Sequence, residues 1–262
     1  MAGKEYALVT GASKGIGAEL AEQLAADHWN LVLVARGRGE LETLAKALTA
    51  KHGIKALVLP ADLAQPNAAA DLWNRVSAQG VKVEVLINNA GFGLLGPFHE
   101  TPIQRELEMI QVNITALTEL TKLALPSLLE RRRGWILNVG STAGFVPGPL
   151  MSVYYASKAY VLSFSEALTA ELAGTGVSVT VLCPGPTRTQ FSATAHSSDS
   201  KLFQGGRAME AGPVARAGLA GLFAGKAIVV PGFQNKLMIQ ALRIAPRWLV
   251  RRITHSMQQT VK

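Results

Sequence analysis

Residues 8–17, "LVTGASKGIG", decide how this sequence is interpreted, because they join an apolar run to a glycine-rich turn and then to a segment of helical period. Gly11, Gly15 and Gly17 allow the backbone to turn tightly and to come close to a bound group. The free amides and the dipole at the start of the following helix favour an anion. Many strand-to-helix turns contain glycine, so the meaning of this turn depends on the rest of the chain.

Seven short apolar runs recur along the chain: "YALVT", "LVLVA", "IKALVLP", "VEVLIN", "GWILNVG", "VSVTVLC" and "AIVVP". Segments of helical period, such as "GAELAEQLAADH", separate them. Short apolar strands that alternate with helices predict a parallel sheet covered on both faces. We therefore predict the α/β class, as a doubly wound (Rossmann) seven-stranded parallel sheet. In that setting the opening turn is typical of dinucleotide binding.

The chain shows no linker that would divide this sheet, so we expect a single domain with a C-terminal helical extension. The Rossmann-type domain is predicted over residues 1–234. Its least regular stretch, residues 184–212, is predicted to be a substrate loop, because long loops in compact domains are often lids. Residues 235–262 are predicted to form a basic amphipathic helical extension, interrupted at Pro246.

The composition is that of a globular protein, with 262 residues, 48% of them hydrophobic, and a single cysteine. That residue, Cys183, ends an apolar run and is expected to be buried. No apolar stretch approaches the roughly 20 residues of a membrane span, and the first strand-like run starts too early for a signal peptide to precede it. We expect a cytoplasmic location, with peripheral attachment to a membrane as the alternative.

The net charge of +8 comes from one end of the chain. From Ala211 onward there are eight Lys and Arg and no Asp or Glu, which leaves 18 basic and 18 acidic residues in the body. A basic amphipathic helix of this kind lies on anionic lipid or packs on a subunit or its own domain. The repeats that indicate it are Arg243, Arg247 and Arg251 on one side, and Leu249, Ile253 and Met257 on another. No base-reading motif supports binding of nucleic acid.

Motifs further along the chain agree with the opening turn. That turn has the spacing G-x-x-x-G-x-G after Thr10, and it is followed by "NNAG" at 88–91, "VN" with Asn113, Ser141 placed 13 residues before Tyr154, Tyr154-x-x-x-Lys158, and "PG" at 184–185. In this combination and order the chain resembles the short-chain dehydrogenase/reductase family over about residues 5–232. The family's Asn-Ser-Tyr-Lys tetrad is intact.

The resemblance implies an oxidoreductase that interconverts a carbonyl and a secondary alcohol with a nicotinamide cofactor. It makes Tyr154 the acid in reduction and the base in oxidation. Ser141 then bonds the substrate oxygen, Lys158 grips the nicotinamide ribose, and Asn113 holds a water that continues the proton path. Lys158 lies one helical turn from Tyr154, so its ammonium is expected to lower the pKa of the phenol. The family also implies a dimer or tetramer.

Tyr155 also lies near Lys158, since i, i+3 neighbours on a helix meet. The choice of Tyr154 rests on its spacing from Ser141 and Lys158, and Tyr155 is then predicted to serve packing.

The cofactor is predicted to be NADP(H) rather than NAD(H). In "LVLVARGR" Ala35 occupies the place of the acid that bonds the ribose in NAD enzymes, and Arg36 follows it. Lys14 adds a second cation, and a guanidinium suits a phosphate. The predicted cofactor-binding residues are Gly11, Ser13, Lys14, Gly15, Ile16, Gly17, Arg36, Asp62, Leu63, Asn89, Ala90, Gly91, Tyr154, Lys158, Pro184, Gly185, Thr187 and Thr189.

The substrate is predicted to be hydrophobic: a fatty-acyl, sterol-like or aromatic carbonyl. The pocket is expected to contain Phe92, Phe145, Leu150, Met151 and Phe191, together with Val146 and Phe203. Two alternatives stay open, a dinucleotide-sensing binding protein with weak or lost catalysis and a lipid-associated reductase at a membrane surface. The five histidines are scattered without metal-ligand spacing, so no metal is predicted.

Overall fold

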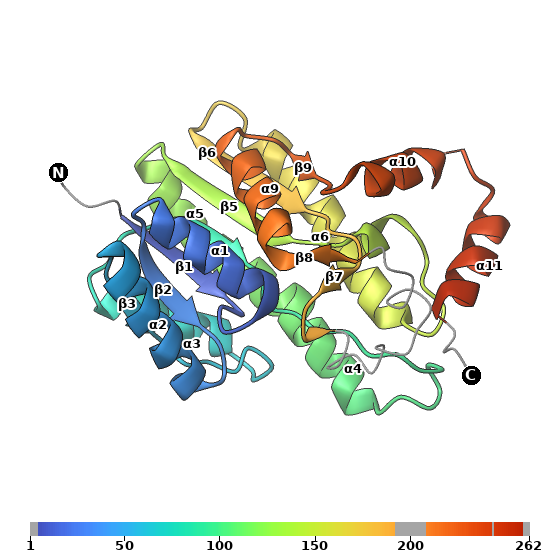
Figure 1. The fold of residues 1–262 in the computed structure, drawn as a ribbon, viewed down its shortest axis with the longest axis horizontal. Helices are drawn as coiled ribbons and strands as arrows, with labels where there is room; N and C mark the ends of the chain where they lie inside the picture. Colours follow the sequence, from blue (N-terminus) through green and yellow to red (C-terminus); the bar gives the residue numbers. More distant parts are fainter. Residues whose placement is uncertain (1–4, 192–207, 243, 259–262) are drawn as a thin grey trace.

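The structure is a computed structural model that describes residues 5–191, 208–242 and 244–258. Seven parallel strands form one sheet in the order β3-β2-β1-β4-β5-β6-β9 (Figure 1). The fold prediction is confirmed, including the single domain and the helices that follow the last strand. The strands are β1 Tyr6–Thr10, β2 Asn30–Val34, β3 Ala56–Val58, β4 Val83–Asn88, β5 Gly134–Val139, β6 Val177–Leu182 and β9 Ile228–Val229.

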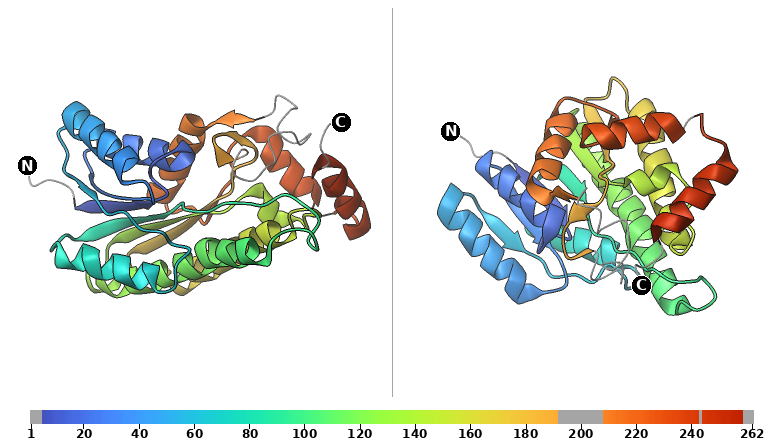
Figure 2. Two further views of the ribbon diagram at one scale, coloured as in Figure 1. Left: turned by 90° about the horizontal axis from the view of Figure 1, so that it is seen from below. Right: turned by 45° about the vertical axis from the view of Figure 1, so that its right-hand side comes forward.

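Helices cover both faces of the sheet, so the molecule has three layers (Figure 2). The strands are apolar almost throughout because each has side chains in both cores. In β1, for example, Ala7 and Val9 face one core and Leu8 faces the other. The first face carries α1 Gly15–Ala26, α2 Arg38–His52 and α9 Ala211–Phe223, and the second carries α3 Ala68–Ala78, α5 Leu117–Glu130 and α6 Ser152–Glu171. α4 Ile103–Ile110 packs against α6.

A π-helical turn, η1 Gln111–Ala116, joins α4 to α5, and a short 3-10 helix, η2 Thr142–Phe145, follows β5. The substrate-loop prediction covers a small pair of strands, β7 Thr187–Arg188 and β8 Met209–Glu210. Residues 192–207 of that loop, and with them Phe203, lie outside the described residues.

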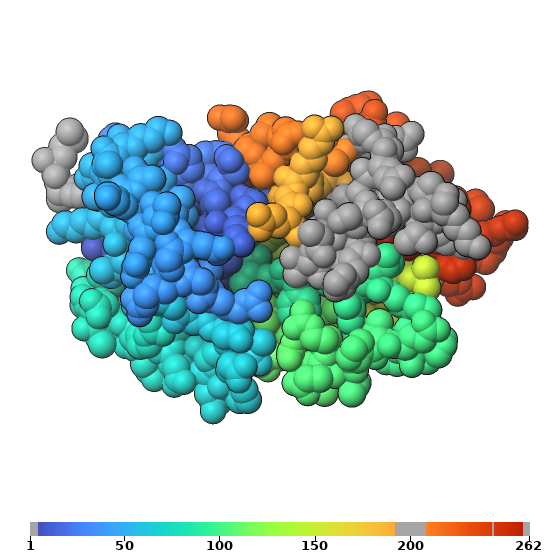
Figure 3. All heavy atoms as spheres, turned by 60° about the horizontal axis from the view of Figure 1, so that its bottom comes forward, coloured from blue at the N-terminus to red at the C-terminus, as the bar shows by residue number. Residues whose placement is uncertain are grey.

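The strand order creates one opening for a ligand. The chain moves from β1 outward to β3 and then returns to place β4 on the other side of β1. Loops that leave the carboxyl ends of β1 and β4 therefore diverge, and such a switch point is where open parallel sheets bind ligands. The surface is hollowed between the blue and cyan N-terminal segments and the green segment around α4 (Figure 3).

The C-terminal extension consists of two helices, α10 Phe233–Leu242 and α11 Arg247–Gln258, at the edge of the molecule farthest from β3 (Figure 1). Of the predicted basic repeat, Arg247 and Arg251 lie on α11, and Arg243 lies outside the described residues. α11 buries a stripe of Val250, Thr254 and Gln258. Among the described residues, no helix has both the length and the apolar character needed to cross a membrane.

Candidate active site

The turn between β1 and α1 needs its glycines. Gly11 and Gly15 have φ angles of 63° and 57°, a region that side chains with a Cβ rarely adopt. A Cβ at Gly17 would lie 2.1 Å from the carbonyl oxygen of Gly11, so α1 closes on the turn only because this position has no side chain. The backbone between Gly11 and Ile16 therefore lies open to the cavity.

Thr10 and Asn89 hold the two diverging loops together. The Thr10 hydroxyl accepts hydrogen bonds from the amides of Asn89 and Ala90, both at 3.0 Å. In return, the Asn89 side-chain amide donates to the carbonyls of Thr10 at 2.9 Å and Gly11 at 3.1 Å. The ends of β1 and β4 are thus cross-linked, and this fixes the glycine turn beside the segment from Asn89 to Gly91.

The end of the cleft beside the glycine turn contains two cationic side chains, Lys14 and Arg36, which differ in whether they form an ion pair. The Lys14 ammonium forms an ion pair with Glu40 at 2.7 Å, and the hydrogen bond from Lys14 lowers the pKa of Glu40. Arg36 forms no ion pair with any residue that the structure describes, and it lines the cavity beside Ala35 and Asp62. Of the two predicted cations, Arg36 is therefore the one whose charge is not already paired.

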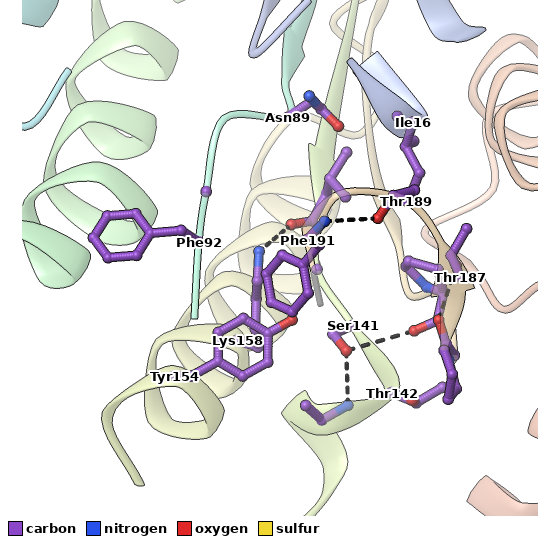
Figure 4. A pocket seen from close by; sticks show the side chains of 18 of the residues that line it. Ile16, Asn89, Phe92, Ser141, Thr142, Tyr154, Lys158, Thr187, Thr189 and Phe191 are labelled. Carbon is purple, nitrogen blue, oxygen red and sulfur yellow. Dashed lines mark hydrogen bonds between the residues drawn. The ribbon is translucent and has the colours of Figure 1, made fainter. Parts of the chain in front are cut away.

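Ser141, Tyr154 and Lys158 come together at the other end of the cleft (Figure 4). The Ser141 hydroxyl caps η2 by accepting a hydrogen bond from the Ala143 amide at 3.1 Å, and it donates to the carbonyl of Pro184 at 3.5 Å. The Lys158 ammonium donates to the carbonyl of Val139 at 2.8 Å and lies 5.8 Å from the centre of the Tyr154 ring. Two elements, the end of β5 and the first turns of α6, thus present these groups to one space.

Burial dominates the protonation equilibria of this group. It raises the pKa of Tyr154, and the hydrogen bond with Ser141 offsets only part of that shift. Burial also lowers the pKa of Lys158 to about 8. The expectation that the lysine would lower the pKa of the phenol is therefore not met in the protein by itself. Desolvation disfavours the charged forms of both groups and is the largest cause of both shifts.

Asn113 supports the site from behind the cavity wall. Its side-chain amide donates to the carbonyl of Phe92 and to the hydroxyl of Ser157, both at 3.0 Å, and its oxygen accepts from the Phe92 amide at 3.1 Å. The side chain is 1% exposed and does not line the cavity. The π-helical turn around Asn113 instead displaces backbone carbonyls from their regular helical partners, and such turns are frequent at functional sites.

A single cavity of about 1670 Å³ connects the glycine turn and Arg36 with Ser141, Tyr154 and Lys158. Ligand pockets usually measure about 300–1,000 Å³, so this one has room for a dinucleotide and a substrate together. Every predicted cofactor residue lines it except Gly17, whose role is close packing. The glycine turn, the free Arg36 and the open cleft fit a nicotinamide dinucleotide. Among the described residues there is no group of three or more His, Cys, Asp or Glu that could hold a metal ion.

The predicted substrate residues divide into two groups. Phe92, Met151 and Phe191 line the cavity, as does Val146. Phe145 does not, because it packs against a core cluster of α5, α6 and β6 residues that includes Leu162. Leu150 is also absent from the cavity wall, and its carbonyl accepts a hydrogen bond from the Gly96 amide at 2.8 Å.

Sequence reasoning missed one wall of the cavity. Side chains of α10 and α11 line it, namely Met238, Leu242, Val250, Ile253 and Met257. The signal that could have found them was the apolar side of the C-terminal amphipathic helix. From the sequence, that side was assigned to contact with lipid or to packing on protein, and not to a ligand cavity.

Comparison with known proteins gives the family. Residues 5–200 match the short chain dehydrogenase family model. A very-long-chain 3-oxoacyl-CoA reductase of Pyrenophora tritici-repentis is 41% identical over 179 residues, which are 66% of this chain and 52% of that protein. The duck (Anas platyrhynchos) protein of the same name is 36% identical over 193 residues, 71% of this chain and 61% of that protein. The chain thus matches between about half and three fifths of the length of these curated relatives.

Solved structures agree over a larger share of the chain. A short-chain dehydrogenase from Sphingobium yanoikuyae in complex with NADPH is 34% identical with a TM-score of 0.83, and the match covers 94% of each chain. The bulky-bulky ketone specific alcohol dehydrogenase from Comamonas testosteroni is 31% identical with a TM-score of 0.78, covering 91% of this chain and 92% of that one. Fold, cleft and sequence lead to one conclusion: the chain belongs to the short-chain dehydrogenase family of oxidoreductases.

Proposed function

We propose that this protein is an NADP(H)-dependent reductase that converts the carbonyl of an apolar substrate into a secondary alcohol, with Asn113, Ser141, Tyr154 and Lys158 as its functional tetrad. The observation that carries the proposal is the convergence of Ser141, Tyr154 and Lys158 at one end of a cavity whose other end is the glycine turn. A bound nicotinamide cofactor supplies or accepts the hydride.

Tyr154 serves as the proton donor. Its raised pKa keeps the hydroxyl protonated at neutral pH, which is the form needed to protonate the oxygen of a carbonyl during reduction. The Ser141 hydroxyl acts on the same phenol, and its proton, which donates to the Pro184 carbonyl at the long distance of 3.5 Å, can turn toward the same substrate oxygen. Both groups then stabilise the negative charge that develops on the oxygen.

Lys158 and the turn at Asn113 serve the return of the proton. With a pKa of about 8, the Lys158 amine is mainly charged at neutral pH, and its proton can move with a small driving force. Asn113 and Lys158 both approach Gly91: a Cβ on that residue would lie 2.9 Å from the Asn113 side-chain oxygen and 3.5 Å from the Lys158 amine. We place a water at a backbone carbonyl of the π-helical turn as the link to solvent.

The preference for NADP(H) rests on Arg36. Its guanidinium lies at the carboxyl end of β2 without an ion-pair partner in the described part of the chain, and Ala35 leaves no carboxylate to bond a ribose or repel a phosphate. Lys14 contributes less, because Glu40 already neutralises it. A solved relative described as bound to NADPH supports the same preference.

The substrate class follows from the apolar wall and from the relatives. Met151, Phe191 and the side chains of α10 and α11 make the end of the cavity near Tyr154 apolar. Two curated relatives are very-long-chain 3-oxoacyl-CoA reductases, and a structural neighbour is specific for bulky-bulky ketones. We therefore favour a long 3-oxoacyl chain over a compact sugar or a small charged ketone.

The surface of the C-terminal extension favours a second candidate, a reductase that works while attached to an anionic membrane surface. Ile244 is 88% exposed, Phe233 79% and Trp248 59%, and exposed arginines lie beside them at 247, 251 and 252. Apolar and basic side chains gathered on one short segment suit the interface of an anionic bilayer.

The test of the proposed reaction is NADPH consumption with a panel of carbonyls, measured on the wild type and on Tyr154→Phe. We expect turnover of 3-oxoacyl thioesters and a loss of about 100- to 10,000-fold in kcat in the variant, since a positioned acid contributes that much. Cofactor binding should stay within about twofold, because the ring and its packing are kept. Undiminished turnover in Tyr154→Phe would contradict the assignment of the acid.

A further inference from the structure

We infer that α11 is a wall of the substrate cavity and that Ile253 and Met257 on it determine which substrates the enzyme accepts. This inference deepens the proposed function, because it assigns the place of the substrate's apolar body. The extension would then be neither a mere packing element nor only a contact to lipid.

Two neighbouring stripes of α11 border the cavity and differ in burial. Val250, Thr254 and Gln258 are buried and attach the helix to the domain. Ile253 and Met257 lie one step along the helix surface and line the same cavity. They remain 51% and 36% exposed, so much of their apolar surface is not covered by protein. Apolar side chains that line a cavity without being covered by protein are suited to contact an apolar ligand.

The wall is continuous with the rest of the site. Met238 and Leu242 of α10 line the same cavity, as do Met151 and Phe191, and the Phe191 ring centre is 5.3 Å from that of Tyr154. An apolar surface therefore extends from the reacting hydroxyl to the extension. A long acyl chain whose carbonyl lies at Ser141 and Tyr154 has this surface to follow.

One anchor ties α11 to the catalytic helix. The Gln258 side-chain amide donates a hydrogen bond to the Tyr155 hydroxyl at 2.5 Å, and both residues are buried. The Tyr155 ring is itself fixed, because a Cβ at Gly148 would lie 2.1 Å from its Cγ. Tyr155 follows Tyr154 in α6 and meets its ring edge-on, with ring centres 5.9 Å apart. The position of the wall is thus set relative to the hydroxyl that reacts.

The experiment changes the wall without touching the tetrad. Ile253→Trp should fill the space of the acyl chain, and Ser256→Trp is the matched control, since Ser256 is exposed on the same helix and does not line the cavity. The substrates are N-acetylcysteamine thioesters of 3-oxobutanoic and 3-oxododecanoic acid. In Ile253→Trp we expect kcat/KM for the long thioester to fall about tenfold or more, and the value for the short one to stay within about twofold.

Met257→Ala should raise the ratio of kcat/KM for bulky substrates to kcat/KM for the short one, because the smaller side chain widens the cavity. If the ratio of long to short substrate in Ile253→Trp equals that of Ser256→Trp and the wild type, the wall plays no part in selection and the inference is wrong.

A binding measurement separates this inference from the proposed reaction. Calorimetric titration of the 3-hydroxydodecanoyl thioester into protein with NADPH needs no turnover. We expect the dissociation constant to rise about tenfold in Ile253→Trp and to stay unchanged in Ser256→Trp. If the wild type reduces no carbonyl substrate, only the proposed function is wrong. If Ile253→Trp binds the thioester as tightly as Ser256→Trp, or if the wild type does not bind it, the inference that α11 contacts the substrate is wrong.

Discussion

In the proposed mechanism Lys158 must keep its charge although it is buried. Its amine would have to be charged to take part in proton return and to hold a ribose, whereas burial lowers its pKa to about 8. Among the described residues, this amine forms one hydrogen bond, which it donates to the carbonyl of Val139 at 2.8 Å. The proposed mechanism therefore depends on the charge of a group whose pKa lies only slightly above neutral pH.

The first prediction concerns pH. We expect kcat/KM for reduction to fall above about pH 8 with one ionisation, since loss of the Lys158 proton removes the ammonium. The stability effect has the opposite sign. Because the folded-state pKa lies below the ordinary 10.5, the unfolded chain binds more protons between about pH 8 and 10.5, and the contribution of this group to stability rises with pH there.

A pH profile of initial rates at saturating NADPH and low substrate measures the activity limb. Lys158→Arg is the informative variant, because a guanidinium stays charged over the whole range. If the wild-type profile stays flat through about pH 9.5, Lys158 does not control the reaction.

Arg36 carries the second prediction. We expect Arg36→Ala to raise the dissociation constant for NADPH about 10- to 100-fold, since hydrogen bonds between charged groups contribute about 1.5–3 kcal/mol. Binding of NADH should change less than about twofold, because it lacks the phosphate. Arg38→Ala is the control: Arg38 is exposed and already pairs with Glu42 at 3.4 Å. Equal losses for both cofactors in Arg36→Ala would refute the phosphate contact.

At the scale of elements, the turn from β1 into α1 shows why a glycine spacing carries so much information. Gly11 and Gly15 supply the left-handed backbone, and Gly17 supplies the absence of a side chain against the Gly11 carbonyl. These are different demands met by the same residue type. The π-helical turn at Asn113 has no comparable mark in the sequence, because it depends on the contacts of its amide with Phe92 and Ser157.

A pair of glycine substitutions tests that turn. Gly17→Ala should destabilise the fold by about 1–3 kcal/mol through overpacking and weaken NADPH binding at least about tenfold. Gly39→Ala is matched to it, since Gly39 lies in the first turn of α2 and a Cβ there meets nothing within 4 Å. There we expect unchanged binding and a gain of up to about 1 kcal/mol from helix propensity. Thermal melts with and without NADPH give both quantities, and a neutral Gly17→Ala would contradict the close-packing argument.

At the scale of the whole molecule, charge and shape concentrate at one end. The excess of +8 arises from residues after Ala211, and the extension that carries much of it also closes one side of the cavity. Exposed apolar side chains accompany the arginines of α11, so one surface combines the two features that anionic membranes attract.

Vesicle binding of the full chain tests this arrangement. We expect co-sedimentation with phosphatidylserine vesicles, weaker at high salt, and none with phosphatidylcholine, since each basic residue near an anionic surface contributes about 1 kcal/mol. Reversal of Arg247, Arg251 and Arg252 to Glu should reduce binding at least about tenfold. The control reverses Arg38, Lys46 and Lys55, which are exposed at the opposite end and change the net charge equally. If both triple variants pellet alike, α11 is not the contact.

Local patterns carried much of the information needed. The seven apolar runs, the glycine turn and the Ser141–Tyr154–Lys158 spacing depend on periods and separations that a sequence displays directly, and the structure has the expected sheet and brings those three side chains together. The pKa of Tyr154 could not be predicted in the same way. Its direction is set by burial in the folded protein, which outweighs the lowering effect of Ser141.

By itself the sequence determined the sheet, the family and the turn that fits a dinucleotide, because each follows from residues close together along the chain or from motifs in a set order. Only the tertiary structure decided which apolar side chains reach the cavity. Phe145 packs into the core although it is near Ser141 in sequence, whereas Ile253 and Met257 line the cavity although they are about a hundred residues from Tyr154. The reason is physical: a cavity wall is formed by long-range packing, and here the hydrogen bond between Gln258 and Tyr155 joins α11 to α6.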